Sequence, residues 1–237
     1  VQRTGFLYQA AFETRLSAEK FMTDGRHTGT GGGNHFVMGG ATPADSPFLR
    51  RPDLLASLIA YWHNHPSLSY LFSGLFIGPT SQAPRVDEAR NDQVYELEIA
   101  LREIERSKLL HTPHMPPWLV DRTLRNILVD VTGNTHRSEI SLDKFWNPAW
   151  AAGCQGLIEF RALETFPKHQ WASAVALLWR ALAVHLLDPT SRPPALKPWG
   201  ETLHDQWLLP SQLWLDLGQV LDELEQAGYP LERPIFQ

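Results

Sequence analysis

The seven residues Leu157-Ile-Glu-Phe-Arg-Ala-Leu163 alternate between apolar and charged side chains. Successive side chains of a β-strand point to opposite faces, so this alternation predicts a strand with one apolar face and one face that carries Glu159 and Arg161. The stretch at 169–187 is apolar nearly all round, which predicts a helix buried on most sides. Together the two segments favour a sheet packed against helices.

A second charged strand is predicted at 137–142, where Arg137 and Glu139 share one face and apolar residues share the other. If the two strands pair, one surface of the sheet presents both acids and both arginines. Carboxylates suit a hard cation, and guanidinium groups suit phosphate or carboxylate. The alternative is a solvated outer face with cross-strand ion pairs.

The remaining elements determine the fold class. Apolar spacing and turn residues predict helices and strands in an order without regular βαβ alternation, which favours an α+β fold with a mainly antiparallel sheet. The stretch at 66–84 is broken by glycine and proline and is interpreted as a structured loop. The other predicted helices are 6–22, 53–63, 92–106, a short one after 117, and 210–226, and the other predicted strands are 34–38 and 127–131.

Composition excludes several classes of protein. The chain has 237 residues, 43% of them hydrophobic, which is typical of a globular protein with a real core. Its 21 basic and 26 acidic residues give a net charge of −5, which gives no indication of nucleic-acid binding. The single cysteine, Cys154, excludes a disulfide framework and a multi-cysteine metal site. No apolar run reaches the roughly 20 residues that span a bilayer, and no signal peptide opens the chain, so we expect a cytoplasmic protein without membrane contact.

A glycine-rich loop precedes the strand at 34–38 and contains Gly31, Gly32 and Gly33. Backbone N–H groups without side-chain cover can surround an anion, although no Gly-Lys-Ser/Thr follows as in a P-loop. The alternative is an ordinary tight turn. His35 follows this loop and could bind a metal or a phosphate, or could be an ordinary structural histidine.

Four long runs, at 24–36, 40–52, 67–90 and 130–137, resemble hallmark segments of the putative amidoligase family. In that family the region is usually the back half of a large bacterial protein whose front half is a transglutaminase-like domain. The resemblance covers essentially the whole chain, so residues 1–237 are expected to form a single amidoligase-like domain cut from a longer protein.

The resemblance also implies a distant relation to glutamine synthetase and the glutamate–cysteine ligases. It therefore implies a glutamine-synthetase-like catalytic core. This core is expected to be incomplete here, because the family's acidic strand, which supplies further metal ligands, is expected before Val1. The run Gly-Asn-His at 33–35 is similar to the ligases' glycine-rich strand, which implies that His35 binds metal. The run Ile-Glu-Phe-Arg at 158–161 is similar to their Glu-x-Arg strand. In the ligases, the glutamate of this strand binds the same metal, and the arginine holds the substrate acid or its phosphate. The resemblance implies these roles for Glu159 and Arg161.

Further roles follow from the same resemblance. His-Arg-Ser at 136–138 is similar to an element that contacts nucleotide phosphate, which points to Arg137, and the glycine loop would lie over the nucleotide or substrate. Arg85 and Arg90 are candidates for orienting the substrate.

The chain also departs from the ligase pattern. Val37 stands where the ligases have a second histidine, and Leu71 and Phe72 replace a basic pair. The substrate pocket therefore cannot be a glutamate site.

These features lead to the hypothesis of an ATP- and Mg²⁺- (or Mn²⁺-) dependent carbon–nitrogen ligase. A small-molecule or peptide carboxylate would be activated as an acyl phosphate and attacked by an amine, alongside the transglutaminase-like domain of the same polypeptide. Lacking its acidic strand, the fragment could be inactive by itself. The alternative is a non-catalytic substrate-binding or scaffold module for the transglutaminase-like half.

Overall fold

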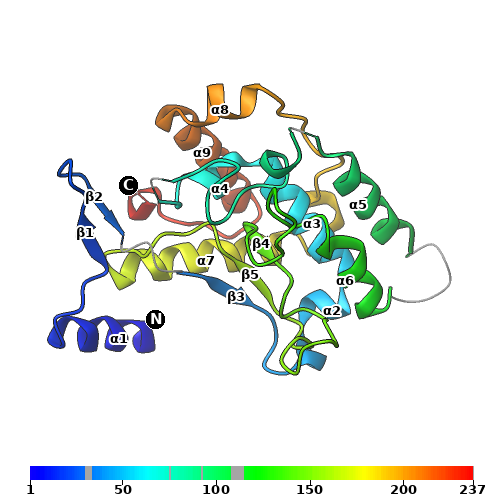
Figure 1. Ribbon diagram of the computed structural model, residues 1–237, viewed down its shortest axis with the longest axis horizontal. Helices are drawn as coiled ribbons and strands as arrows, with labels where there is room; N and C mark the ends of the chain where they lie inside the picture. Colours follow the sequence, from blue (N-terminus) through cyan, green and yellow to red (C-terminus); the bar gives the residue numbers. More distant parts are fainter. Residues whose placement is uncertain (30–33, 75, 92, 108–114, 237) are drawn as a thin grey trace.

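In the computed structural model, the predicted strand at 157–163 forms β5 (Ile158–Phe160), the central strand of a three-stranded antiparallel sheet. β3 (Phe36–Met38) pairs with one edge of β5 and β4 (Ile140–Ser141) with the other (Figure 1). The sheet order is thus β3-β5-β4, and the predicted antiparallel pairing is confirmed. The structure describes residues 1–29, 34–74, 76–91, 93–107 and 115–236.

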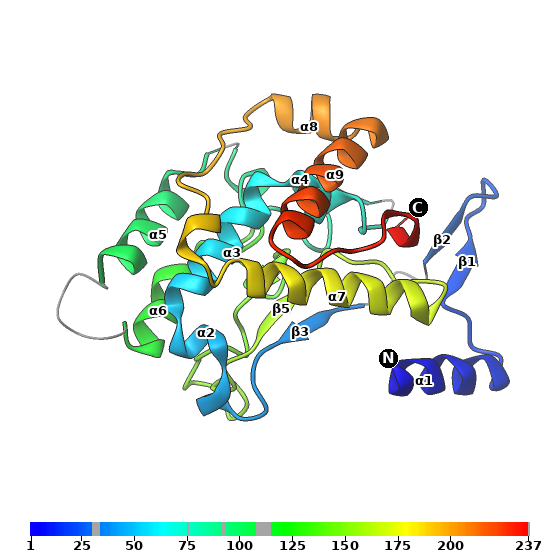
Figure 2. The same cartoon turned by 180° about the vertical axis from the view of Figure 1, so that it is seen from behind.

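Helices surround this small sheet and make up about half of the described chain (Figures 1 and 2). The longer helices are α1 (Gln2–Glu13), α3 (Pro52–Asn64), α5 (Tyr95–Ser107), α7 (His169–His185) and α9 (Pro210–Gln226). The shorter helices are α2 (Pro47–Arg50), α4 (Pro66–Tyr70), α6 (Pro117–Arg125) and α8 (Thr202–Trp207). The architecture is α+β, as predicted.

The apolar face of the sheet packs against α7 and α3. Trp179 of α7 is 1% exposed, and its ring meets Phe36 and Phe160 edge-on at centroid distances of 6.3 and 6.2 Å. Trp62 of α3 lies 4.7 Å from Trp179 and 4.8 Å from Phe160, which brings two helices and two strands together in one aromatic core. Edge-on pairs of this kind add to the free energy gained by burying their area. The prediction of a sheet packed against this helix is confirmed, but α7 is not buried on most sides, because Trp171, Leu177 and Val184 are 40, 53 and 45% exposed.

The helices predicted from strong apolar periodicity are found close to their expected bounds. The stretches 53–63, 92–106 and 210–226 are the helices α3, α5 and α9. Pro52 and Pro210 occupy the first turns of α3 and α9, where a missing N–H costs nothing because that group has no partner inside the helix. Local chemistry is sufficient to place these helices.

The predicted helix at 6–22 is wrong beyond Glu13. The hydroxyl of Thr14 donates to the carbonyls of Ala10 and Ala11, and Arg15 has the left-handed backbone angle φ +61°, which ends the helix. The next residues instead form a hairpin of β1 (Glu19–Phe21) and β2 (His27–Gly29). This hairpin lies beside α1 at one end of the molecule (Figure 1).

Three further predictions need correction. The expected strand at 127–131 is a turn, because one carboxylate oxygen of Asp130 accepts from the backbone N–H groups of Thr132 and Asn134. The stretch 66–84 is not a loop throughout, since Pro66 begins α4. The expected strand at 137–142 is also shorter, because only Ile140–Ser141 pair as β4.

No helix in the described part of the chain is both long and apolar enough to cross a membrane.

Candidate functional site

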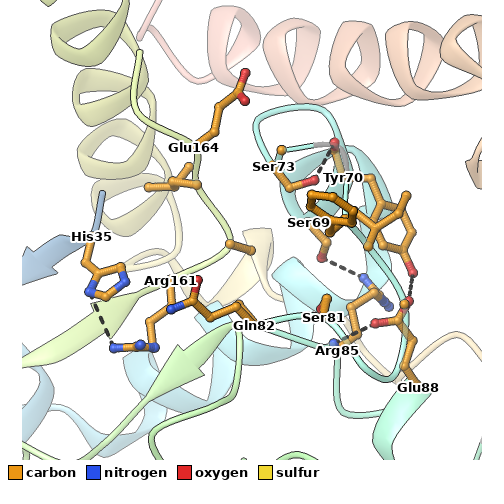
Figure 3. A pocket seen from close by; sticks show the side chains of 17 residues that line it. His35, Ser69, Tyr70, Ser73, Ser81, Gln82, Arg85, Glu88, Arg161 and Glu164 are labelled. Carbon is orange, nitrogen blue, oxygen red and sulfur yellow. Dashed lines mark hydrogen bonds between the residues drawn. The ribbon is translucent and has the colours of Figure 1, made fainter. Parts of the chain in front are cut away.

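A cavity of about 170 Å³ lies between the end of the sheet and α4 (Figure 3). One side is formed by His35, which directly precedes β3, and by Arg161, which directly follows β5. Because Phe36 lies opposite Phe160, these two residues are neighbours at the same end of the sheet. The other side is formed by Ser69, Tyr70, Arg85 and Glu88. Residues between 73 and 83, and Ala162, Leu163 and Glu164 after Arg161, complete the lining.

Glu159 is at the centre of the basic cluster on the sheet side. Its Oε1 lies 2.5 Å from Nδ1 of His35 and 3.0 Å from Nη1 of Arg161. Its Oε2 lies 3.2 Å from Nζ of Lys144. No sequence pattern pointed to Lys144, which comes from the loop between β4 and β5.

The charges of this cluster follow from these contacts. Burial opposes ionisation of Glu159, but Lys144 and Arg161 hold its pKa below the ordinary value, so it is a carboxylate at neutral pH. Burial and the nearby Arg161 lower the pKa of His35, which is therefore a neutral imidazole. One carboxylate against two cations leaves the cluster with a net positive charge.

The short contact with Glu159 also determines the tautomer of His35. A neutral imidazole nitrogen facing a carboxylate at 2.5 Å must carry the proton, so Nδ1 donates and Nε2 keeps its lone pair. This is the arrangement of metal-binding histidines, whose second nitrogen is oriented by a carboxylate. Glu159 orients His35 through one oxygen, Oε1.

Arg161 has unused hydrogen-bonding capacity. Its side chain is only 3% exposed, yet Nε is buried without a hydrogen-bond partner among the described residues. A buried N–H without a partner is costly, and guanidinium groups bind carboxylate and phosphate through paired N–H donors. The side chain therefore suits an anionic group in the cavity.

The opposite side of the cavity is built on Arg85, which is 1% exposed. Its Nε and Nη2 donate to the two carboxylate oxygens of Asp87 at 2.9 and 3.0 Å, and Nη1 donates to Ser69 Oγ at 2.9 Å. Nη2 also donates to the carbonyl of His63 at 2.9 Å. Burial lowers the pKa of the His63 imidazole to about 4, with Arg85 adding to the effect, so this histidine is neutral.

Glu139 lies behind this wall and is 4% exposed. Its Oε2 accepts from the hydroxyl of Ser69 at 2.6 Å and from the indole N–H of Trp62 at 3.1 Å. Burial raises the pKa of Glu139 to about 7, although Arg85 and the Ser69 hydrogen bond oppose the shift. Alternation along the strand placed Glu139 on the charged face but could not show its partners, which are distant in sequence.

Glu88 completes the wall and is a further acid that the sequence did not single out. Its Oε1 accepts from the Tyr70 hydroxyl at 2.6 Å and lies 2.7 Å from Nε2 of His204 in α8. Its Oε2 accepts from the backbone N–H of Arg85 at 2.9 Å. The sequence offered one signal, the pair of acids at 87–88 flanked by arginines.

The structure brings together only part of the predicted set. His35 and Arg161 line the cavity and Glu159 contacts both, whereas Arg137 is not among the lining residues. Arg137 instead lies 3.5 Å from Asp130 and donates to the carbonyl of Ser81 at 2.8 Å. Ser81 does line the cavity, so Arg137 contacts the site only through the loop that carries Ser81.

Of the other predicted site residues, some line the cavity and others do not. Arg85 lines the cavity, but its guanidinium is bound to protein groups. Arg90 lies outside the lining, because it donates to the carbonyl of Asn126 at 2.6 Å and pairs with Glu96 at 2.8 Å. The predicted cofactor-binding glycines Gly31, Gly32 and Gly33 lie outside the described residues.

The two charged strands do pair, and the backbone N–H of Arg161 donates to the carbonyl of Glu139 at 2.8 Å. Glu139, Glu159 and Arg161 are 4, 4 and 6% exposed. The alternative of a solvated outer face is therefore wrong. Within the described part of the chain, no group of three or more His, Cys, Asp or Glu side chains is placed to hold a metal ion.

Comparison with known proteins gives the family. A sequence model of the family described as putative amidoligase enzyme matches residues 1–237. The chain belongs to this putative amidoligase family. Membership of the amidoligase family indicates a ligase that forms carbon–nitrogen bonds. No curated protein and no solved structure matches the chain significantly.

Proposed function

We propose that this amidoligase joins a carboxylate to an amine with ATP and Mg²⁺ (or Mn²⁺), through an acyl phosphate. The carboxylate, the phosphates of ATP and the acyl phosphate are all anions. The observation that carries the proposal is the buried guanidinium of Arg161, which lines the cavity in a cluster of net positive charge and keeps Nε without a partner among the described residues. Family membership supports the same class of reaction.

Arg161 would bind and orient the anion with its guanidinium group, which lines the cavity. Binding of this kind places a carboxylate in a fixed position for attack, and it stabilises negative charge as that charge moves during the reaction. Ala162 and Leu163 follow directly in the chain, line the cavity and are each 7% exposed. An apolar wall beside the anion would limit access of water to an activated carboxyl group.

The donors beside Arg161 fit a metal that arrives with a nucleotide. Mg²⁺ is commonly held by one or two carboxylates, with phosphate oxygens and water completing its shell. Glu159 supplies an ionised carboxylate. His35 donates its Nδ1–H to that carboxylate, so Nε2 faces away from it, and the two side chains would bind one ion only after the ring turns. Bound Mg²⁺ would neutralise charge on the phosphates.

Calorimetric titration of the purified full-length protein with Mg·ATP tests the proposal. Arg161→Gln removes the positive charge and most of the N–H donors, and hydrogen bonds to charged groups are worth about 1.5–3 kcal/mol. We therefore expect Mg·ATP to bind the variant about tenfold or more weakly than wild type. Arg102→Gln is the matched control, because Arg102 is an exposed arginine on α5 whose one ion pair among the described residues is with Glu98.

Three results would contradict the proposal: no binding of Mg·ATP by the wild-type protein, equal binding by wild type and Arg161→Gln, or binding indifferent to His35→Ala and Glu159→Ala. A wild-type protein that binds no nucleotide but retains peptide carboxylates in the same titration would favour the alternative, a substrate-binding module.

A further inference from the structure

The wall opposite Arg161 contains a chain of hydrogen bonds that leads from the cavity to a buried acid. Ser69 lines the cavity (Figure 3), and its hydroxyl donates to Glu139 Oε2 at 2.6 Å. Arg85 Nη1 donates to the same hydroxyl oxygen at 2.9 Å, so one lone pair of Ser69 Oγ is occupied and the other is unused by these two partners. A donor in the cavity could use that lone pair.

We propose that Glu139, acting through the hydroxyl of Ser69, accepts the proton that the amine substrate must lose. This inference rests on the proposed amide-forming reaction. An amine that carries a proton has no lone pair to attack a carbonyl carbon, so one N–H bond must break before or during attack. The cavity places this relay opposite the anion-binding side chain of Arg161, on the two sides of one volume of about 170 Å³.

The transfer balances in two linked steps. An N–H bond of the ammonium group breaks and its proton joins Ser69 Oγ, while the proton already on Oγ moves to Glu139 Oε2. The electron pair left on nitrogen then forms the C–N bond to the activated carboxyl carbon. A second proton passes from that nitrogen to the departing phosphate, which leaves with the electrons of the C–O bond. Glu139 returns its proton to solvent before the next turnover.

The groups around Glu139 suit a proton acceptor that works near neutral pH. Arg85 favours the carboxylate, whereas burial and the two acids Asp87 and Glu88 favour the protonated form. The other titratable groups on this wall are His63 of α3, which is neutral, and Tyr70 of α4, whose pKa is raised by burial. His204 of α8 bonds to Glu88. The pKa of about 7 that results for Glu139 lies near the value that proton transfer at neutral pH requires.

The test is the pH dependence of phosphate release from Mg·ATP, with a panel of mono- and dicarboxylates and short peptides as acids. Ammonium chloride is the amine in one series and hydroxylamine in the other. Hydroxylamine is already uncharged at neutral pH and needs no proton removed before attack. We expect Glu139→Gln to lower the ammonium-dependent rate about 100-fold and to abolish the rise in rate between pH 6 and pH 8, while the hydroxylamine-dependent rate falls less than about tenfold.

Three further variants make the result specific. Glu223→Gln is the matched control, because Glu223 accepts a 2.7 Å hydrogen bond from the Tyr61 hydroxyl outside this cavity. It should leave the pH profile unchanged. Ser69→Ala should reproduce the loss seen with Glu139→Gln, whereas Ser69→Thr keeps a hydroxyl and should recover most of the rate. If circular dichroism shows that Glu139→Gln does not fold, the difference in rate between Ser69→Ala and Ser69→Thr tests the relay instead.

The possible failures are distinguishable. A wild-type protein that releases no phosphate with any acid would overturn the proposed function and the relay with it. The relay alone would be overturned if the wild type is active and Glu139→Gln keeps the same pH profile and amine dependence. If Glu139→Gln does not fold, the same result with Ser69→Ala would overturn the relay.

Discussion

Glu139 is a carboxyl group that the fold removes almost entirely from water, at 4% exposure. Burial disfavours the ionised form of an acid, and only the hydrogen bonds from Ser69 and Trp62 and the charge of Arg85 compensate. On the other side of the cavity, Glu159 is also 4% exposed, yet its pKa is lowered because two cations contact it. The pKa values of these two glutamates are thus shifted in opposite directions, because Glu139 loses more of its hydration and two cations contact Glu159.

This difference has a consequence for stability at the scale of the residue. The pKa of Glu139 is about 7 in the folded protein and 4.5 for an unperturbed side chain, so the folded state binds this proton more tightly. The stabilisation is complete below about pH 4.5 and is lost as the pH rises to about 7. Between pH 5 and pH 8 the loss is about 2–3 kcal/mol, because one pKa unit corresponds to about 1.4 kcal/mol.

Urea unfolding of wild type and Glu139→Gln at these two pH values measures the effect. Glutamine cannot titrate, so the unfolding free energy of the variant relative to wild type should rise by about 2–3 kcal/mol from pH 5 to pH 8. A constant difference across this range would show that Glu139 does not carry the shift.

At the scale of the element, the sheet is short and depends on close backbone contacts where its strands end. Gly40 follows β3, and a Cβ atom placed there would lie 2.6 Å from the carbonyl oxygen of Asp45 and 2.6 Å from the backbone nitrogen of Ser46. Backbone atoms cannot move aside as a flexible side chain can. The segment that holds His35 and β3 is thereby fixed against the turn before α2.

Gly40→Ala should therefore destabilise the protein by about 1–3 kcal/mol or more, the usual range for overpacking. Gly5→Ala is the matched control within α1. A Cβ atom at Gly5 would meet only the His169 ring, at 3.4 Å, and replacing glycine by alanine inside a helix gains up to about 1 kcal/mol. Thermal unfolding should show opposite shifts for the two variants, and shifts of the same sign would contradict this account.

At the scale of the whole molecule, one buried polar network connects segments that are far apart in the sequence. Arg85 bonds to Asp87, to Ser69 of α4 and to the carbonyl of His63 at the end of α3. Glu88 extends the network to His204 of α8, and Glu139 connects it to the sheet. The cavity wall therefore takes its position only when α3, α4, α8 and the sheet are packed together.

Arg85→Met removes the cation from this network and leaves the Asp87 carboxylate buried without its partner. Breaking a buried ion pair in this way typically costs about 3–5 kcal/mol. Arg102→Met, which removes only an exposed i,i+4 pair with Glu98, should cost at most about 0.5 kcal/mol. Urea unfolding compares the two variants. The double variant Arg85→Met/Asp87→Asn should be more stable than Arg85→Met alone, and equal or lower stability would contradict the ion-pair explanation.

The sequence by itself determined the central strand, the helices α3, α7 and α9, and the shared face of Glu159 and Arg161. Each of these follows from side-chain periodicity, which is a property of neighbouring residues along one element. The prediction of a helix over 6–22 was wrong beyond Glu13, because the spacing of apolar residues does not reveal a single residue with left-handed backbone angles, such as Arg15.

Only the tertiary structure decided what the charged face does. It excluded Arg137 from the cavity lining, brought Lys144 to Glu159, and buried Glu139 against Ser69, which is 70 positions away in the chain. The charge of a buried side chain depends on how much water it loses and on which charges lie within a few ångströms. Those neighbours come from distant parts of the chain, so no local pattern can specify them.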